Sequence, residues 1–424
     1  MRRLLFLIFF LLFTSSFITL KAQNTWLKKT NYGGGGRDDA SGFAIGNTGY
    51  ILSGTDTGGY FTDMWAWNSQ SDAWTQVASY PGGKRIGTKS VSFNGFGYVL
   101  GGEEPASCYG PYKTRGAVCN GTFYRDIWRY DPDSNSWLRI DTFPGLARDF
   151  AVAVMDPNDS TIYYGTGNDN DTGYLSDWWS YYIPGHTWTQ LADFGGGQRN
   201  NAVGFCVNGI IYVGTGDDND MANYASSDFW QYTPATNSWK RVSDIPGLPL
   251  RNASGFAIDS FGYVCLGISD TSYTANGWRY NPATDTWAPI ANFGGDIMAD
   301  GVAFTIGNNG YIGTGSHNGN DLSQFWEYTL DSTLGAPVAT SATAIHLYPN
   351  PAKGTINVSY TGVTGFPALL KITDAAGNLV GTYTITNNTG QALIDVTGLA
   401  PGAYFYRLSG YGIQTNTGKF IITR

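Results

Sequence analysis

The sequence predicts an all-β chain in which a six-bladed β-propeller precedes a small Ig-like β-sandwich. A pattern of strand, turn and strand with two spaced tryptophans, clearest at residues 228–239, recurs about every 50 residues. A period of this length with several short strands per unit is typical of a propeller blade. The 57 glycines, with 15% aromatic and 14% charged residues, also favour turn-rich β structure. The leading tryptophans are Trp65, Trp128, Trp179, Trp230, Trp278 and Trp326.

The residues within one unit explain why it forms part of a sheet. Trp230 and Tyr232 alternate with polar residues, as in a strand that buries one face. Residues 234–238 have turn chemistry, and Trp239 begins the next strand. Of the 14 tryptophans, 12 occupy two fixed places in six such units. Because one blade cannot bury this aromatic face alone, we expect the blades to stack around a ring.

The two ends of the propeller are predicted to meet. The sixth unit has Gly335 where its second tryptophan is expected, while Trp26 stands in an N-terminal stretch that resembles the one around Trp239. We therefore expect the N-terminal strand to complete the last blade, which removes the open edges of the array. The propeller is expected to span residues 24–330.

The repeat resembles the kelch motif. Each unit has a Gly-Tyr or Ile-Tyr pair before a glycine-rich strand end, followed by the aromatic pair and second tryptophan at similar spacing. The paired glycines of the motif occur once, at Gly101 and Gly102, and other units read Gly-Thr-Gly or Ser-Gly-Thr. The resemblance implies a fold and leaves the activity open, because propellers support both binding and catalysis. The dipeptides are Gly49-Tyr50, Gly97-Tyr98, Ile162-Tyr163, Ile211-Tyr212, Gly262-Tyr263 and Gly310-Tyr311.

Residues 1–22 have the features of a secretory signal peptide. Arg2 and Arg3 precede an apolar core at residues 4–13, which is short for a bilayer-spanning helix. In an exported protein, Cys108 and Cys119 of the long second-blade insert are expected to form a disulfide. Cys206 and Cys265 lie in strand patterns and are expected to be small apolar residues of the interior.

Two sets of polar residues recur on the loops expected at one end of the ring. Acidic loops follow the second strands of blades 3, 4 and 6. Their clustered oxygens suit calcium, yet their spacing is not that of an EF-hand, and turn hydrogen bonding explains them more simply. We therefore predict no resident cofactor, with calcium as the alternative. As a ligand-binding rim beside the recurring arginines, we predict Asp169, Asp171, Asp217, Asp218 and His317.

Arginines precede the first strands of five blades, with Met298 expected at the same place in the sixth. They are either ties between adjacent blades, as the kelch resemblance implies, or donors on a rim that binds an anion or a sugar. We favour ties for the individual arginines and still predict that a partner binds this end of the ring, because its loops vary most. The arginines are Arg37, Arg85, Arg148, Arg199 and Arg251.

The composition changes after Tyr328. A small, polar linker at 331–344 precedes about 80 residues of alternating strands, predicted as a β-sandwich at 345–424. This segment resembles the type A C-terminal sorting domain of the type IX secretion system. The matching features are Tyr-Pro-Asn-Pro at 348–351, Asp-x-x-Gly at 374–377, Pro-Gly-x-Tyr at 401–404 and Gly-Lys-Phe at 418–420. The resemblance implies export to the surface of a Gram-negative bacterium, or release, through the type IX machinery.

Two classes of function fit this organisation. We predict a secreted or surface-bound module, expected to be monomeric, that binds a glycan or a surface protein. The formal net charge of −8 argues against a nucleic-acid partner. The alternative is a carbohydrate-active enzyme similar to the sialic acid mutarotases, with Glu103 or Glu104 acting beside Arg85. An oxidase similar to galactose oxidase lacks its copper ligands, since only His186 and His317 fall in the propeller, so no catalytic residue or metal ligand is assigned.

Overall fold

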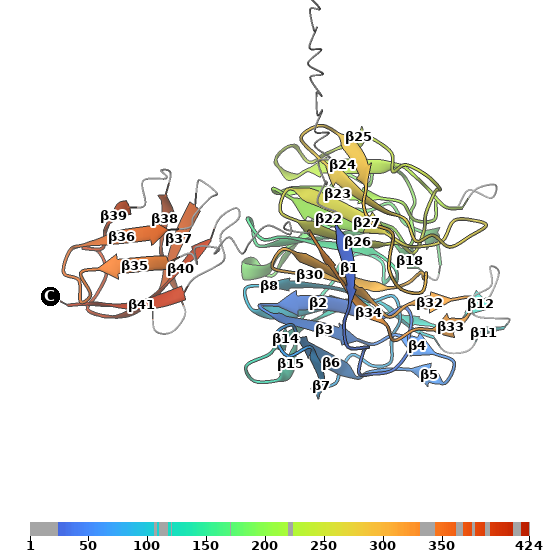
Figure 1. Cartoon of the computed structure of the whole chain (residues 1–424), viewed down its shortest axis with the longest axis horizontal. Coiled ribbons are helices and arrows are strands. Elements are labelled where there is room, and N and C mark those ends of the chain that lie inside the picture. Colours follow the sequence, from blue (N-terminus) through green and yellow to red (C-terminus); the bar gives the residue numbers. More distant parts are fainter. Residues whose placement is uncertain are drawn as a thin grey trace, which may run out of the picture.

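The computed structural model describes residues 24–105, 108–109, 118–119, 121–169, 171–218, 224–330, 344–361, 368–374, 378–385, 391–409 and 417–423. The expected signal peptide and nearly all of the expected linker lie outside these ranges. Within them no helix is long and apolar enough to cross a membrane. The described chain is all-β, which confirms the predicted fold class (Figure 1).

Six four-stranded antiparallel sheets form the propeller, each ordered from the inner to the outer strand. Blade 1 contains β2 (Ser41–Ile45), β3 (Thr48–Leu52), β6 (Met64–Asn68) and β7 (Ala73–Val77). Blade 2 contains β8 (Lys89–Phe93), β9 (Phe96–Leu100), β14 (Asp126–Asp131) and β15 (Ser136–Thr142). Blade 3 contains β16 (Val152–Asp156), β17 (Thr161–Gly165), β20 (Trp178–Tyr182) and β21 (Thr187–Gln190).

The remaining three blades repeat this order. Blade 4 contains β22 (Val203–Val207), β23 (Ile210–Gly214), β24 (Phe229–Thr233) and β25 (Ser238–Val242). Blade 5 contains β26 (Ser254–Ile258), β27 (Phe261–Cys265), β28 (Gly277–Asn281) and β29 (Thr286–Pro289). Blade 6 contains β30 (Val302–Ile306), β31 (Asn309–Gly313), β34 (Phe325–Thr329) and, as its outer strand, β1 (Thr25–Lys28).

The N-terminal strand β1 takes the place of the missing outer strand of blade 6. Figure 1 shows β1 beside β34. Trp26 lies opposite Tyr328, as Trp239 lies opposite Tyr232 in blade 4. The Trp26 indole donates to the Ala291 carbonyl at 3.0 Å. The Trp239 indole makes the equivalent bond to Ala192 at 3.0 Å. The first and last parts of the propeller sequence therefore share one blade, which gives blade 6 four strands like the other five.

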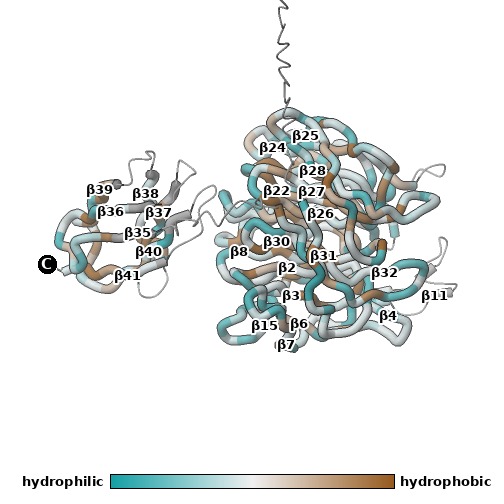
Figure 2. The backbone as a smooth tube through the Cα atoms, in the orientation of Figure 1, coloured by the Kyte–Doolittle hydropathy of each residue, from teal (hydrophilic) through white to brown (hydrophobic). Residues whose placement is uncertain are grey.

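Complementary side-chain volumes pack neighbouring blades. Phe43 of blade 1 lies against Gly97 of blade 2, where an added Cβ would collide with the ring. Val91 of blade 2 is smaller, and the place that faces it in blade 3 is filled by Ile162. Protein interiors are close-packed. The choice between Gly-Tyr and Ile-Tyr in a blade therefore follows from the size of the inner-strand side chain that faces it in the preceding blade, which is Phe43 in blade 1 and Val91 in blade 2. Figure 2 shows hydrophobic residues along the inner strands and hydrophilic ones at the outer turns.

The two ends of the ring differ in construction. One end, which we call the loop face, carries the connections between second and third strands and those that enter each blade. Its short hairpins are β4/β5 (Thr55–Asp56, Gly59–Tyr60), β10/β13 (Glu103–Glu104, Thr122–Phe123), β11/β12 (Cys108–Tyr109, Val118–Cys119), β18/β19 (Asn168–Asp169, Gly173–Tyr174) and β32/β33 (Ser316–His317, Asn320–Asp321). The opposite end, the turn face, carries tight turns, two of which contain the 3₁₀ turns η1 (Ile183–Gly185) and η2 (Pro234–Thr236).

The cysteines fall into two groups. The backbone places Cys108 opposite Cys119 in the β11/β12 pair. Directly paired antiparallel residues have Cα atoms about 4.5–5.5 Å apart, which is within disulfide range. Their side chains lie outside the described residues, so the disulfide stays a prediction. Cys206 and Cys265 are free thiols, and only Cys265 is buried in the core.

The C-terminal domain is a separate two-sheet sandwich. One sheet contains β35 (Ala344–Tyr348), β36 (Thr355–Thr361) and β39 (Gln391–Asp395). The other contains β37 (Ala368–Thr373), β38 (Leu379–Ile385), β40 (Gly402–Ser409) and β41 (Thr417–Ile422). Its own core includes Ile356, Leu370 and Phe420, each fully buried.

Candidate ligand site on the loop face

Four of the five recurring arginines are buried ion-pair partners. Each of these arginines is at most 2% exposed. Its guanidinium group binds the aspartate that stands two residues before the leading tryptophan of the same blade. In blade 2, Arg85 donates to both Asp126 oxygens at 2.5 and 2.8 Å and to the Gly101 carbonyl at 3.0 Å. The four pairs are Arg37–Asp63, Arg85–Asp126, Arg148–Asp177 and Arg199–Asp228.

The backbone of the same arginines binds the preceding blade. The Arg85 carbonyl accepts from Gly54 of blade 1 at 2.9 Å, and the Arg148 carbonyl accepts from Gly102 of blade 2 at 2.8 Å. One residue thus joins two blades, through its main chain to one and its side chain to the next. The Arg85 side chain also lies 3.5 Å from the centre of the Tyr124 ring. These four guanidinium groups hold the ring together and are not exposed on the loop face.

Arg251 does not occupy the same place, which corrects the alignment made from the sequence. The equivalent place in blade 5 belongs to Leu250, whose carbonyl accepts from Gly216 at 2.7 Å. Arg251 lies one residue further on, half-buried, and its Nε atom is buried without a hydrogen-bond partner. Among the described residues it makes no ion pair. Arg251 is therefore the recurring arginine whose charge remains available on the loop face.

The place held by Arg251 differs in every blade. It follows the position that is arginine in four blades, Leu250 in blade 5 and Met298 in blade 6, and it carries acidic, amide, basic or apolar side chains. The residue after it has a left-handed backbone in each blade, with φ between 43° and 61°. The main chains at that second place bond one to the next, for example Gly87 to Asp39 at 3.3 Å and Phe150 to Gly87 at 2.9 Å. The residues at the variable place are Asp38, Ile86, Asp149, Asn200, Arg251 and Ala299.

The residues at these places form a circle around one end of the channel. A carboxyl pair lies on this circle where blades 2 and 3 meet. Glu103 and Asp149 are 5% and 3% exposed, and each has one carboxyl oxygen without a hydrogen-bond donor. Burial, and then the Glu103 carboxyl, raise the pKa of Asp149 well above its usual range. Burial also raises the pKa of Glu103. Both shifts favour the protonated forms, because two neighbouring carboxyl groups cannot both ionise cheaply in a buried site.

Lys89, the first residue of β8, lies among the acids of the same circle. Burial lowers its pKa, against the opposing effect of the Asp300, Asp39 and Asp149 carboxylates. Between blades 3 and 4, burial and then the Asp217 carboxylate raise the pKa of Tyr174 to about 12, and Arg251 acts in the opposite direction. The Tyr174 hydroxyl donates to Asp217 at 3.1 Å. The circle therefore offers two cations, several carboxyl groups and a phenol around the end of the channel.

The predicted acidic-loop residues have varied environments. Asp169 is 6% exposed, and one of its oxygens accepts from the Thr172 and Gly173 amides at 2.7 and 2.8 Å, as a turn residue does. Asp218 accepts from the Ser226 hydroxyl at 2.9 Å. Asp171 is exposed at the hairpin tip, and His317 packs 4.6 Å from the Tyr273 ring. In the described ranges no three carboxylate, histidine or cysteine side chains come together as a metal site.

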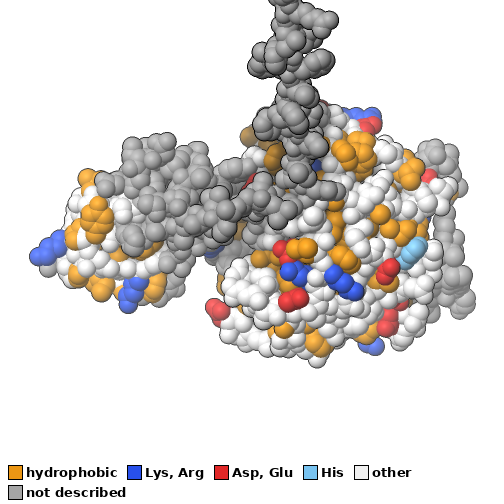
Figure 3. Space-filling model, in the orientation of Figure 1, with side chains coloured by type: hydrophobic (Ala, Val, Ile, Leu, Met, Phe, Trp, Pro, Cys, Tyr) orange, Lys and Arg blue, Asp and Glu red, His pale blue; other side chains and the backbone are white. Residues whose placement is uncertain are grey.

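The structure separates the pair proposed from the sequence for an enzymatic role. Arg85 is occupied by Asp126, Glu103 faces Asp149, and Glu104 accepts from the Tyr124 hydroxyl at 2.6 Å. Sequence reasoning missed Lys89, Asp39, Asp149 and Asp300. A signal existed for Asp149, which follows a position that is arginine in four blades and whose counterparts in the other blades differ in charge. On the face that Figure 3 displays, charged side chains are scattered in small groups of mixed sign.

Comparisons with known proteins separate the two domains. Residues 346–423 match the family model described as the secretion system C-terminal sorting domain. Curated relatives match over short stretches. N-acetylneuraminate epimerase of Pasteurella multocida (strain Pm70) is 38% identical over 85 residues, which is 20% of this chain and 22% of the relative. The epimerase of Escherichia coli (strain K12) is 27% identical over 118 residues, 27% of this chain and 31% of the relative.

A solved structure described as that of YjhT superposes with a TM-score of 0.57 at 14% identity and covers 71% of this chain and 95% of that chain. Since the sequence identity is low, this match establishes the fold alone. The curated matches span less than a third of those relatives' length. The sorting domain indicates secretion or a cell-surface location in a bacterium. The chain is a kelch-type β-propeller that carries a C-terminal sorting domain of the type IX secretion system.

Proposed function

We propose that the propeller is a secreted binding module that takes a polar, uncharged or weakly acidic saccharide on the loop face. The observation that supports this most is Arg251, which leaves its charge available while the four other arginines are buried and paired with aspartates. Arginine N–H groups suit carboxylate and hydroxyl oxygens, and the neighbouring acids supply acceptors for sugar hydroxyls. Both kinds of group lie around one end of the channel.

The test is binding of immobilised glycans, followed by calorimetry on the best ligand. Arg251→Gln should weaken binding roughly tenfold or more, since a hydrogen bond to a charged group contributes about 1.5–3 kcal/mol. Arg241→Gln is the matched control, because Arg241 is 57% exposed on the outer strand and paired with Asp244. Unchanged affinity in Arg251→Gln, or equal losses in both variants, would contradict the proposed site.

A second function, epimerisation or mutarotation of an acidic sugar, is supported by the Glu103–Asp149 pair. This pair, with its raised pKa values and Lys89 beside it, provides a proton donor and acceptor. The short matches to N-acetylneuraminate epimerases add to this proposal. One-dimensional NMR of freshly dissolved α-N-acetylneuraminate would report faster anomer exchange with the wild-type protein. Asp149→Asn should abolish the acceleration, and Asp244→Asn should retain it. A wild-type rate equal to buffer excludes the activity.

We also propose that the sorting domain delivers the propeller to the outer surface of a Gram-negative cell and takes no part in ligand binding. The domain has its own core, so its removal leaves the six blades intact. A chain that ends after Tyr328 should bind the same glycan and remain in the periplasm of the native host. Fractionation and surface proteolysis measure the location, and surface delivery of the shortened chain would overturn the proposal.

A further inference from the structure

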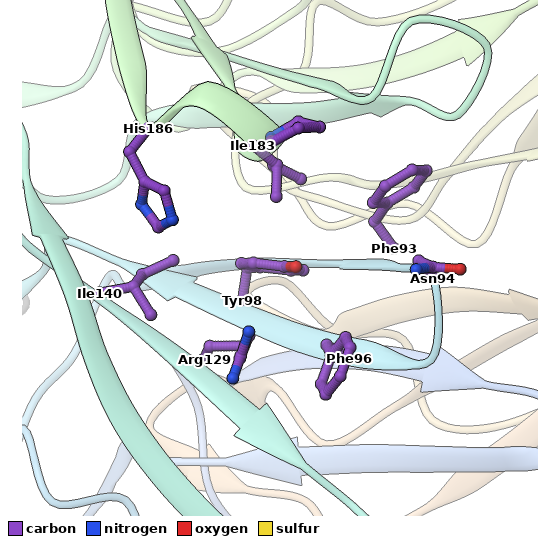
Figure 4. Close-up of a pocket in the computed structure, with 9 residues that line it drawn as sticks. Phe93, Asn94, Phe96, Tyr98, Arg129, Ile140, Ile183 and His186 are labelled. Carbon is purple, nitrogen blue, oxygen red and sulfur yellow. The ribbon is translucent and has the colours of Figure 1, made fainter. Parts of the chain in front are cut away.

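The turn face holds a pocket that the proposed function does not use. It has a volume of about 260 Å³ and lies where blades 2 and 3 meet. Phe93, Phe96 and Tyr98 line it from the inner half of blade 2, and Arg129 and Ile140 from the outer half. The η1 turn of blade 3 closes its other side through Ile183, Pro184 and His186. Figure 4 shows His186 and Ile183 on one side of this space and Tyr98, Ile140 and Arg129 on the other.

The pocket lies where the repeat loses its usual tie between blades. In four blades the left-handed residue of the outer turn is Asn or Asp, and its side chain accepts an amide of the preceding blade, as Asn237 does from Ala192 at 2.9 Å. Blade 3 has His186 there, bonded through Nδ1 to the Tyr181 hydroxyl at 2.9 Å. In other blades the equivalent indole donates to the preceding blade, as Trp239 does to Ala192. The Trp188 indole is instead buried without a hydrogen-bond partner. A β-bulge after Ile127 shifts the outer strand of blade 2 at the same boundary.

These departures coincide in one place within an otherwise regular ring. Bulges and lost local regularity concentrate at functional sites, because a structural repeat alone gains nothing from them. The arginine supports the same view. Arg129 stacks 4.5 Å from the Phe96 ring centre, pairs with no acid among the described residues, and has a buried Nε without a partner. Its neighbour Asp131 accepts an amide of its own turn, from Asp133 at 3.0 Å, and interacts with Arg129 as a nearby charge without a direct ion pair.

Blade 5 provides an internal comparison. Arg279 stacks 4.7 Å from the Phe261 ring centre and lies opposite Tyr263, as Arg129 lies opposite Tyr98. The Arg279 Nε, unlike that of Arg129, is not among the buried atoms that lack a hydrogen-bond partner. The stacking is therefore a recurring structural feature, while the open guanidinium edge and the cavity are features of the blade 2–3 boundary.

We propose that this pocket binds a small organic carboxylate with a planar or branched apolar body. Stacking on Phe96 occupies one face of the Arg129 guanidinium and leaves its in-plane N–H groups for a bidentate carboxylate. Phe93, Tyr98, Ile140 and Ile183 contact the apolar body. The volume admits a ligand of about ten non-hydrogen atoms, near the lower limit for small-molecule sites. The proposal is independent of the saccharide site, which lies on the opposite face.

Phenylacetate is the probe, and phenylacetamide is its neutral counterpart. Titration of the full-length protein, followed by calorimetry and ligand-observed NMR, should give saturable phenylacetate binding in the low millimolar range. Phenylacetamide should bind roughly tenfold more weakly or worse, because it lacks the charge that Arg129 meets. Absence of saturable phenylacetate binding, or equal affinity for the two probes, would overturn the proposal.

The variants place the binding in this pocket. Arg129→Gln should weaken phenylacetate binding roughly tenfold or more. Arg279→Gln loses the same stacking in blade 5 and should bind phenylacetate as the wild type does. Similar melting temperatures for Arg129→Gln and Arg279→Gln exclude a folding effect. If the two melting temperatures differ, Arg129→Lys serves as a second variant, because it retains the charge and should retain most of the phenylacetate binding. Arg251→Gln should leave phenylacetate affinity unchanged, which separates this site from the loop face. Equal losses in Arg129→Gln and Arg279→Gln would show that the pocket is not the site.

Discussion

Blades 4 and 6 solve the same packing problem with different chemistry. In blade 4, Arg199 donates to both oxygens of Asp228 at 2.7 and 3.1 Å, and Asp228 accepts the Trp230 indole at 2.7 Å. In blade 6, Met298 and Gln324 hold these two places, with Gln324 Nε2 3.3 Å from the Met298 sulfur and Oε1 accepting the Trp326 indole at 3.2 Å. Blade 5 has Leu250 and Asn276 there.

Both members of the pair change together. A lone buried arginine or aspartate is costly, whereas a well-packed neutral pair stabilises a protein about as well as a buried ion pair does. The exchange in blade 6 therefore preserves the shape of the tie and the bond to the leading tryptophan. The charge itself is dispensable, provided that both partners are exchanged.

The largest expected effect concerns ring closure. Every blade has an outer strand, and only blade 6 takes its outer strand from a segment distant in the sequence. Trp26→Ala should lower the free energy of unfolding by about 3–5 kcal/mol, because it removes a large packed side chain and its bond to Ala291. Denaturant unfolding measures this. Leu27→Ala on the same strand is the control, since Leu27 is 48% exposed. Equal stability of Trp26→Ala and wild type would mean that β1 does not close the ring.

The comparison between blades 4 and 6 is tested directly by exchanging their chemistry. Asp228→Ala should cost about 3 kcal/mol, because Arg199 is left buried without its partner. The double variant Arg199→Met with Asp228→Gln reproduces blade 6 and should lie within about 1 kcal/mol of wild type. Thermal unfolding of the single and double variants gives both values. A double variant less stable than Asp228→Ala would show that blade 4 requires the charge.

A smaller effect separates the buried ties from the carboxyl pair by their response to pH. Burial acts to raise the pKa of Asp126, but hydrogen bonding and charge attraction from Arg85 outweigh it and lower that pKa. The stability this pair contributes is present above about pH 4, the unfolded value, and is lost as the pH falls further. Glu103 and Asp149 have raised pKa values. Their contribution is present below about pH 4 and is lost as the pH rises through the folded values.

The two substitutions should therefore show opposite pH trends. The destabilisation by Asp126→Asn should be greatest near neutral pH and shrink on acidification. The destabilisation by Glu103→Gln should be greatest in acid and shrink as the pH rises. Denaturant unfolding at several pH values measures both, and parallel trends would refute the raised pKa values of the carboxyl pair at the loop face.

The smallest effect on the ring is expected in the blade 2 insert, the longest of the second-to-third strand connections. If Cys108 and Cys119 form the disulfide, closing so short a loop lowers the entropy of the unfolded insert. The bond then stabilises the folded insert by roughly 3 kcal/mol relative to the unfolded one. Reduction should loosen the insert while the melting temperature of the propeller changes little. Mass spectrometry of unreduced peptides checks the bond, and two free thiols would contradict it. Cys108→Ser with Cys119→Ser should reproduce the reduced protein.

The sequence alone was sufficient for the fold because tryptophan spacing and turn residues are local. The two tryptophans of a blade lie on adjacent strands joined by one tight turn, so their separation is fixed by strand length. The missing tryptophan at position 335 and the extra one at position 26 even indicated which strand closes the ring. The sorting domain was equally accessible, since its motifs are short and contiguous.

The sites depended on tertiary structure, because each is assembled from several blades. Whether an arginine is a tie or a ligand donor depends on an aspartate up to 41 residues away, and a shift of one residue separates Arg251 from Arg199. Glu103 and Lys89 belong to blade 2 and Asp149 precedes blade 3, so the three side chains come together only when neighbouring blades pack. The pocket beside Arg129 exists because a bulge, a histidine and an unpaired indole from two blades coincide. No single stretch of sequence contains that coincidence, since contacts between blades are set by the packing of the ring and not by neighbours along the chain.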